Sequence, residues 1–243
     1  MKTRTLTLVS TAVLMANVGA VSAFAAQDED ANSKSATSTA KVEFQAPAEE
    51  TTPPQGTEGP DGPENPDGTP VDPEDGNNSG TGMKGPLSLD YVPNIDFGNQ
   101  EVSSKTQSYN AKNQFPYVQV TDNTGSVSGW NVTVSTDGFT SDSDVLKGAE
   151  LTFAPGQVYT PGSVSTAPEA KAVVVGSEAK TIFNAKKDAG AGTWINQWIG
   201  EEPVDGKGQN DGIQLKVIGG TAKAKAYTAD LVWTITAGPN SEI

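Results

Sequence analysis

Two pairs of carboxylates are the residues of this chain whose spacing could support catalysis. Asp142 and Asp144 are two positions apart, and Glu201 and Glu202 are adjacent. Paired carboxylates hydrolyse glycosides when one acts as the acid and the other as the base or nucleophile. Neither pair lies at a strand end within an aromatic-rich pattern, so we interpret both as solvated loop charges and predict that the protein is not an enzyme.

The chain has no His and no Cys, which removes most other catalytic chemistry. Histidine is the usual general base near neutral pH, and Ser-His-Asp and Cys-His arrangements are impossible here. Zinc, iron or copper would have to bind to carboxylates alone, which suit these metals poorly. Asp142-x-Asp144 or DGKGQNDG (205–212) could hold calcium, although neither matches the carboxylate spacing of an EF-hand. We therefore predict no cofactor and no metal.

Tryptophans are the remaining candidates for a binding site. Trp130 and Trp233 each begin a tripeptide that ends in an apolar residue, Val132 or Ile235, and the two tripeptides are about a hundred residues apart. Each tryptophan lies on the apolar face of an alternating segment, which favours a place in the core. The alternative is an exposed aromatic surface that stacks on sugar rings or packs against a partner. If Trp233 is buried, Trp233→Ala should lower the free energy of unfolding by about 3–5 kcal/mol. If it is exposed, binding should fall while Tm barely moves.

A second tryptophan pair lies in TWINQWI (193–199). If this segment is a strand, Trp194, Asn196 and Trp198 share one face and could form a carbohydrate platform. On a helix, the two tryptophans would form a packing stripe with i, i+4 spacing. A place in a loop or in the core remains a further alternative.

Alternating apolar residues predict strands along most of the C-terminal part of the chain. The clearest is AYTADLVWTITA (226–237), with Tyr227, Ala229, Leu231, Trp233 and Ile235 on one face. In PYVQVTD (116–122), Tyr117, Gln119 and Thr121 alternate with Val118 and Val120. Further strands are predicted at 87–92, 128–136, 149–155, 170–176, 180–185, 193–199 and 212–218. Clusters of Gly, Asn, Asp and Pro at 121–126, 135–138, 154–157 and 205–212 predict turns between them.

These short strands predict an all-β domain at 83–243, an antiparallel Greek-key-like sandwich or barrel. About 160 residues suffice for one self-supporting core. The preceding residues 26–82 are predicted to be a disordered acidic spacer rich in Pro and Gly. In residues 27–82, 13 Asp and Glu accompany only Lys34 and Lys41, and the stretch has too few apolar side chains to offset the entropy of ordering it.

Residues 1–25 have the pattern of a secretory signal peptide. Lys2 and Arg4 precede an apolar stretch, and Ala23-Phe24-Ala25 places small residues where a signal peptidase reads them. The sequence has no thiol for a lipid anchor and no sorting signal at AGPNSEI, so we expect an exported protein with no membrane insertion after signal removal. The net charge of −14 argues against nucleic acid as a partner and favours solubility.

Three segments resemble the WxL-domain surface proteins of low-GC Gram-positive bacteria. They are GPLSLDYVPNIDFGNQ (85–100), SGWNVTVS (128–135) and GTAKAKAYTADLVWTITAGP (220–239), and the resemblance covers the whole predicted domain. The third residue of each motif is Val132 or Ile235, where the family usually has Leu. The signal peptide and the acidic spacer also suit such proteins.

The resemblance implies a non-catalytic, extracellular protein attached non-covalently to the cell wall through peptidoglycan. The binding residues expected from it, together with the second tryptophan pair, are Trp130, Val132, Trp233, Ile235, Trp194 and Trp198. It also implies possible partners among surface proteins, including a membrane-anchored WxL-interacting protein and other WxL proteins, and more loosely host-matrix adhesion. A subunit that docks on such a partner and only appears wall-bound is therefore an alternative hypothesis.

Overall fold

The computed structural model describes residues 36–54, 75, 78 and 80–240. The predicted signal peptide lies outside these residues, and the predicted spacer is described only in part. The chain divides into two compact units, residues 1–43 and 44–243. Residues 36–43 of the first unit are exposed and have no regular secondary structure. All the strands described below belong to the second unit, and the predicted boundary at residue 83 remains a prediction.

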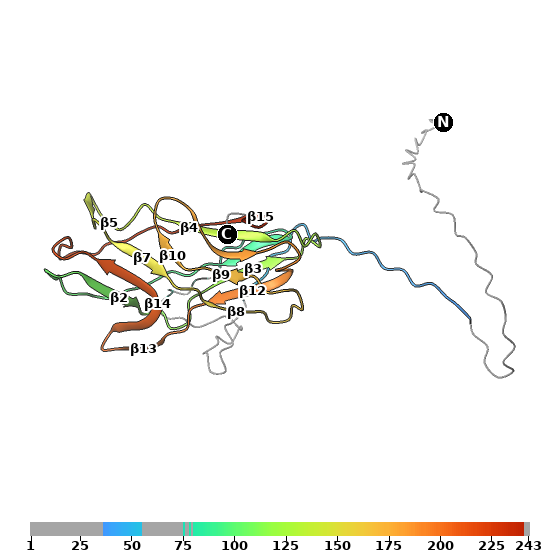
Figure 1. Cartoon of the computed structure of the whole chain (residues 1–243), viewed down its shortest axis with the longest axis horizontal. Helices are drawn as coiled ribbons and strands as arrows, with labels where there is room; N and C mark the ends of the chain where they lie inside the picture. The colour runs from blue at the N-terminus through green and yellow to red at the C-terminus, as the bar shows by residue number, and fades with distance from the viewer. Residues whose placement is uncertain (1–35, 55–74, 76–77, 79, 241–243) are drawn as a thin grey trace, which may run out of the picture. The chain divides into compact units, whose positions relative to one another are not determined.

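The described part of the second unit contains fifteen β-strands and no α-helix (Figure 1). The strands are β1 (Leu87–Tyr91), β2 (Gln107–Ala111), β3 (Tyr117–Asp122), β4 (Trp130–Ser135), β5 (Thr140–Ser141), β6 (Asp144–Val145), β7 (Glu150–Phe153), β8 (Gln157–Tyr159), β9 (Glu169–Ala170), β10 (Val173–Val175), β11 (Lys180–Ala185), β12 (Gly192–Gln197), β13 (Glu201–Val204), β14 (Lys207–Val217) and β15 (Val232–Ala237). Among these residues no helix is long and apolar enough to cross a membrane. The predicted all-β class is confirmed.

The strands form three larger sheets and one small hairpin, and every pairing between named strands is antiparallel. One sheet has the order β1-β3-β12-β8 and a second the order β15-β4-β11-β9. Their edges correspond, because β1 lies near β15 and β8 lies near β9. These two sheets therefore face each other as a sandwich.

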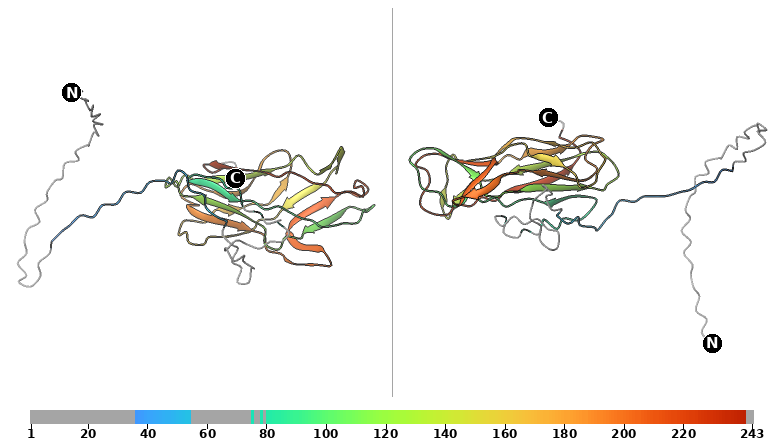
Figure 2. Two further views of the ribbon diagram at one scale, coloured as in Figure 1. Left: turned by 180° about the vertical axis from the view of Figure 1, so that it is seen from behind. Right: turned by 90° about the horizontal axis from the view of Figure 1, so that it is seen from below.

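The third sheet extends the sandwich at one end. Its order is β10-β7-β14-β13, and β2 also pairs with β14. Figure 1 shows β2, β7, β10 and β14 together in one half of the domain, with β3, β4, β12 and β15 in the other half, and Figure 2 shows the same halves from behind and from below. One continuous apolar core takes side chains from all three sheets, among them Val120, Val132, Phe153, Trp194 and Ile213.

The alternation in β4 shows why the sequence folds this way. Trp130, Val132 and Val134 are completely buried, whereas Asn131, Thr133 and Ser135 are partly exposed. Successive side chains of a strand point to opposite faces, so the apolar set enters the core while the polar set remains near the surface. The predicted pattern of this strand is confirmed.

The segment DGKGQNDG differs from the turn predicted over 205–212. Only Asp205 and Gly206 form the turn, and β14 already begins at Lys207. The polar letters are compatible with a strand because Asn210 is buried and its amide donates to the carbonyls of Asn113 and Trp198, each at 3.0 Å. Gly208 lies so close to the backbone of Ala111 that a side chain would not fit there. Close packing and satisfied hydrogen bonds thus override the turn propensity.

The outer face of the sheet that contains β3 is covered by the chain's own N-terminal residues. The side chain of Gln119 donates to the carbonyl of Pro53 at 3.0 Å, and the hydroxyl of Thr81 donates to the carbonyl of Leu89 at 2.5 Å. The hydroxyl of Tyr91 donates to the carboxylate of Asp75. We call residues 50–54, 75, 78 and 80–83 the N-terminal cover. It explains why β3 is buried on both faces although its sequence alternates.

The N-terminal cover encloses the carboxyl group of Asp90. Its oxygens accept hydrogen bonds from Ser88 Oγ at 2.5 Å, Thr121 Oγ1 at 2.7 Å and Gln119 Nε2 at 2.9 Å. Burial raises the pKa of Asp90 above its ordinary value, and the three hydrogen bonds offset only part of that rise. The protonated form is therefore favoured more strongly in the folded than in the unfolded chain.

This pKa shift predicts how the stability of the protein depends on pH. A carboxyl group whose pKa is higher in the folded state stabilises the fold most at low pH, and that contribution is lost as pH rises from about 4 through the folded-state pKa. Asn cannot titrate, so we expect the stability of Asp90→Asn relative to the parent to increase over this range. Urea unfolding of both proteins from pH 3 to pH 7 measures the difference. A difference that stays constant across this range would contradict the assignment.

Candidate functional site

Most of the predicted binding residues lie inside the core. The exposed fractions of the side chains are 0% for Trp130, 2% for Trp198 and 4% for Trp194, and Val132 is also completely buried. Trp130 Nε1 donates to the carbonyl of Gly190 at 2.9 Å, and its ring contacts Phe183 edge to face. The core interpretation of Trp130 is confirmed, and no surface for a ligand remains on it in this fold.

The second tryptophan pair lies on a strand, as one of the sequence hypotheses required. Trp194 and Asn196 belong to β12, and Trp198 follows directly after it. All three side chains are buried. Trp194 Nε1 donates to the carbonyl of Ala191 at 2.9 Å and Trp198 Nε1 to that of Ala154 at 2.6 Å. The predicted stripe is therefore an internal packing surface in this structure.

Trp233 and Ile235 are different, because both are only partly buried. They lie on β15, which pairs with β4 on one side and with no other strand among the described residues. The ring of Trp233 contacts Phe153 edge to face, with centroids 5.9 Å apart. Trp233 also lines a groove of about 1330 Å³. Of the predicted residues, Trp233 alone reaches this groove.

The groove lies between two irregular segments that leave the sandwich at the seam between β1 and β15. Residues 92–102 continue from β1 and form one wall, and residues 222–231 precede β15 and form the other. The floor comes from the inner face of the third sheet and includes Tyr109, Leu151 and Leu215. The groove is thus a place where the layer opposite this sheet is incomplete.

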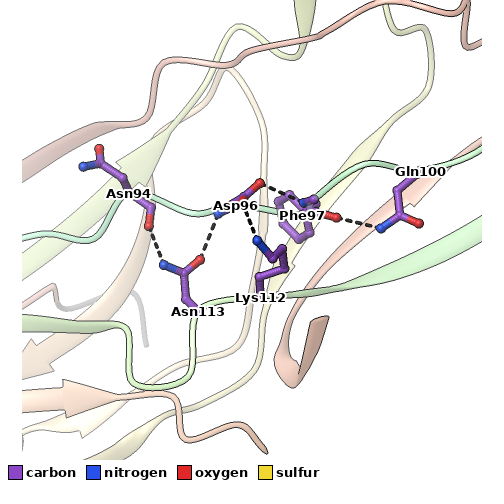
Figure 3. A network of polar contacts seen from close by, with 7 residues as sticks. Asn94, Asp96, Phe97, Gln100, Lys112 and Asn113 are labelled. Atoms are coloured by element: carbon purple, nitrogen blue, oxygen red, sulfur yellow. Dashed lines mark hydrogen bonds and ion pairs between the residues drawn. The ribbon is translucent and has the colours of Figure 1, made fainter. Parts of the chain in front are cut away.

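The first wall is braced by polar side chains (Figure 3). Asn113 accepts from the backbone N–H of Asp96 at 2.8 Å and donates to the carbonyl of Asn94 at 3.0 Å. The carboxylate of Asp96 accepts from the N–H of Gly98 at 2.8 Å and from Lys112 Nζ at 3.2 Å. These side chains are engaged with the wall itself, which holds its backbone in place.

The second wall is braced by the hairpin of β5 and β6. The backbones of Thr228 and Thr140 exchange two hydrogen bonds of 2.8 and 2.9 Å. Asp144 on β6 binds Lys223 and also Lys225, the latter at 2.5 Å. Hydrogen bonds from Lys223 and then Lys225 lower the pKa of Asp144 to about 2. The carboxylate is therefore held in its ionised form, the form that binds both lysines.

Asp142, Asp144 and Glu201, from the two carboxylate pairs that the sequence singles out, do not line the groove. Asp144 is bound by the two lysines, and its neighbour Asp142 lies in the turn of the hairpin with φ 51°. Glu201 is exposed on β13. The part of the chain described here holds no cluster of three or more acidic residues that could hold a metal ion. The bound lysines also occupy the Asp144 oxygens that the calcium hypothesis required.

Most of the residues that line the groove carry no recognisable signal in the sequence. Phe97, Tyr109 and Phe139 line it from three distant parts of the chain, and no local pattern connects them. One signal was present, because the apolar alternation of the last strand starts at Tyr227, whereas β15 begins only at Val232. Apolar residues that alternate ahead of the strand in this way indicate a segment that lines a cavity and does not pair with a neighbouring strand.

Comparison with known proteins adds one finding to this geometry. Residues 31–239 match the family model described as WxL domain, surface cell wall-binding. The match includes β4 and β15 with both tryptophan motifs, as well as the described part of the N-terminal cover. Comparison with curated proteins and with solved structures gave no match.

Proposed function

The chain belongs to the WxL-domain family of surface cell wall-binding proteins, and we propose that it attaches to the wall by binding peptidoglycan in the groove beside Trp233. As a member of this family it is a cell-surface protein that binds the cell wall, and the family is described by binding rather than by catalysis. One observation carries the assignment to the groove. Trp233 is the one motif tryptophan that is only partly buried, and it lines the groove of about 1330 Å³.

The groove has the features expected of a binding site for a polymer. Binding sites are concave and largely apolar, with a few placed polar groups. Here the apolar part comes from Trp233, Tyr227 and the floor, and the polar part from the two backbone walls. Both walls are braced from behind, so little ordering is needed when a ligand binds. In this proposal the buried Trp130, Trp194 and Trp198 support the fold and do not touch the wall polymer.

Binding to protein-free sacculi tests the proposal. We expect Trp233→Ala to weaken sedimentation of the protein with purified sacculi at least tenfold, because truncation removes apolar contact area from the groove. Thr234→Ala is the matched control, since Thr234 is exposed on the same strand and points to the opposite face. Equal binding by the parent and Trp233→Ala would contradict the assignment to the groove.

The same experiment separates peptidoglycan binding from docking on a protein partner. A protein that docks on a membrane-anchored partner, such as a WxL-interacting protein, would not sediment with protein-free sacculi and would do so once the partner is added. Retention on bare sacculi supports the proposal made here. A signal peptide at 1–25 and a spacer between it and the N-terminal cover are part of this proposal, because they place the wall-binding domain outside the cell.

A further inference from the structure

The second wall of the groove continues the free edge of β15, although residues 229–231 are not themselves part of a strand. Side chains alternate along residues 227–237, with Tyr227, Ala229, Leu231 and Trp233 partly buried and the residues between them exposed. The N–H and C=O of Thr228 both bond to Thr140, which places its backbone groups on the hairpin side. In a chain with this alternation the next residue directs its N–H and C=O the other way. The alternation thus assigns the backbone groups of Ala229 and Leu231 to the groove side.

The same parity continues along β15. The N–H of Gly238 bonds to the carbonyl of Gly129 at 2.8 Å, and the register pairs Thr236 with Asn131 and Thr234 with Thr133. Even-numbered residues thus face β4, and odd-numbered residues face away from it. No strand pairs with that side among the described residues. Donors and acceptors are consequently repeated along the groove at every second residue, which is the pattern that an extended peptide can match.

The polar side chains of the groove favour a peptide over a sugar. Recognition of sugar hydroxyls relies on amide and carboxylate side chains that are placed within the site. In the first wall Asp96, Gln100 and Asn113 instead bond to the backbone of their own wall, as Figure 3 shows. The groove therefore offers a ligand a backbone edge, an apolar floor and the carboxylates at its rim. An open edge binds main chain, and the floor beneath it accepts alternate side chains.

The rim of the groove adds a preference for a cation. Lys112 is paired with Asp96, and Lys223 and Lys225 with Asp144. Glu101, Asp205 and Asp230 also line the groove, and among the described residues no ion pair is recorded for their side chains. Lys223 and Lys225 share the single charge of Asp144, so one positive charge remains beside these three carboxylates. The net charge at the rim is still negative, which attracts an amine and repels a second copy of this acidic chain.

From these observations we propose that the groove binds the peptide stems of peptidoglycan, and not its glycan strands. This inference rests on the function proposed above and specifies which part of the polymer is read. A stem is a short extended peptide with small apolar side chains and an amine-bearing side chain. Its main chain pairs with the open edge at Ala229 and Leu231, its apolar side chains face the floor near Trp233, and its amine lies at the acidic rim. Because stems alternate in chirality, they form only a few such bonds, and the affinity for each stem is modest.

Three wall preparations test the inference with the full-length mature protein. They are intact protein-free sacculi, glycan strands from which an amidase has removed the stems, and the released stem peptides. We expect binding to intact sacculi, competition by the released stems, and at least a tenfold loss of binding to the stripped glycan. If stripped glycan binds as well as intact sacculi, the stem inference is wrong while the proposed function stands. If intact sacculi do not bind, the proposed function is wrong as well.

A proline at the open edge tests the role of the backbone. Ala229→Pro removes one N–H that faces the groove and no hydrogen bond recorded within the fold, so we expect at least tenfold weaker binding to sacculi with an unchanged circular dichroism spectrum. Ala229→Ser is the matched control, because it keeps the N–H. Equal binding by the two variants overturns the inference.

A second variant keeps the test decisive if the proline perturbs the fold. Neutralising the rim with Glu101→Gln, Asp205→Asn and Asp230→Asn leaves every ion pair named above intact. It should weaken binding to sacculi several-fold and abolish the difference between untreated and amine-acetylated sacculi. A persistent preference of this variant for untreated sacculi would contradict the assigned role of the rim and overturn the inference.

Discussion

Trp130→Ala is expected to lower the free energy of unfolding by about 3–5 kcal/mol. The side chain is completely buried, contacts Phe183 edge to face with centroids 4.9 Å apart, and donates a hydrogen bond to Gly190. Truncation leaves a cavity at the start of β4 and removes the hydrogen bond to the carbonyl of Gly190. Because the neighbouring strands on both sides hold β4 in register, the cavity cannot collapse completely.

Urea unfolding monitored by circular dichroism measures this effect, since fluorescence would lose one of its reporters. Trp233→Ala is the informative comparison, because the two residues occupy corresponding places in the two motifs and differ in exposure. We expect the loss for Trp233→Ala to be clearly smaller, since part of its ring already contacts solvent. Equal losses for the two variants would show that Trp233 is as deeply buried as Trp130 and would remove the basis for the groove site.

Gly190→Ala is the second variant with a large expected effect. Gly190 has φ 77°, and a Cβ atom would lie 2.7 Å from Nε1 of Trp130 and closer still to the Cβ of Ala185. The left-handed conformation costs a non-glycine residue about 1–2 kcal/mol, and overpacking of a core adds about 1–3 kcal/mol. We therefore expect a loss of about 2–5 kcal/mol in the free energy of unfolding.

Gly125→Ala separates the two causes. Gly125 has φ 69°, and nothing lies within 4 Å of the position where a Cβ would be. It should show only the conformational cost of about 1–2 kcal/mol. If both variants lost the same free energy in parallel denaturation curves, the contact between Gly190 and Trp130 would contribute nothing, and the close approach described here would be incorrect.

The sequence was sufficient to predict the strands with clear alternation. In β4 and in β15, apolar residues at every second position identify both the strand and its inner face, because burial of one face is what such a pattern encodes. Conversely, β2, β8 and β13 were not predicted. These strands are short and polar. They form because they pair with neighbouring strands whose patterns are clearer, as β2 pairs with β14. Their existence depends on contacts between distant segments, which a local pattern does not contain.

The N-terminal cover was missed for a similar reason. The sequence placed residues 50–54 in a disordered spacer, because they have few apolar side chains. They are nevertheless held by hydrogen bonds such as that from Gln119 to the carbonyl of Pro53 and that from the N–H of Gly85 to the carbonyl of Glu50. Backbone carbonyls are present at every residue, so composition gives no sign of such bonds. The alternation of β3 was predicted correctly, whereas the segment that covers the polar face of this strand was not predictable.

Of the residues that line the groove, only Trp233 was predicted as a binding residue. Trp233 was identified by its motif, and Trp130 by the same motif, yet one lines a groove and the other is buried. The difference comes from the sheet order, in which β4 is central and β15 is at the edge. Strand order is fixed by pairing across the whole domain. Two strands that share only the pattern of a tryptophan followed two positions later by an apolar residue do not reveal which of them is the edge.

The position of β15 has a consequence for the order in which the domain is completed. It is the last described strand in chain order, yet it supplies a neighbour for β4 and covers part of the core. Its pairing with β4 joins residues about a hundred positions apart. Contacts between such distant segments slow folding, so we expect the pairing of β4 with β15 to form late.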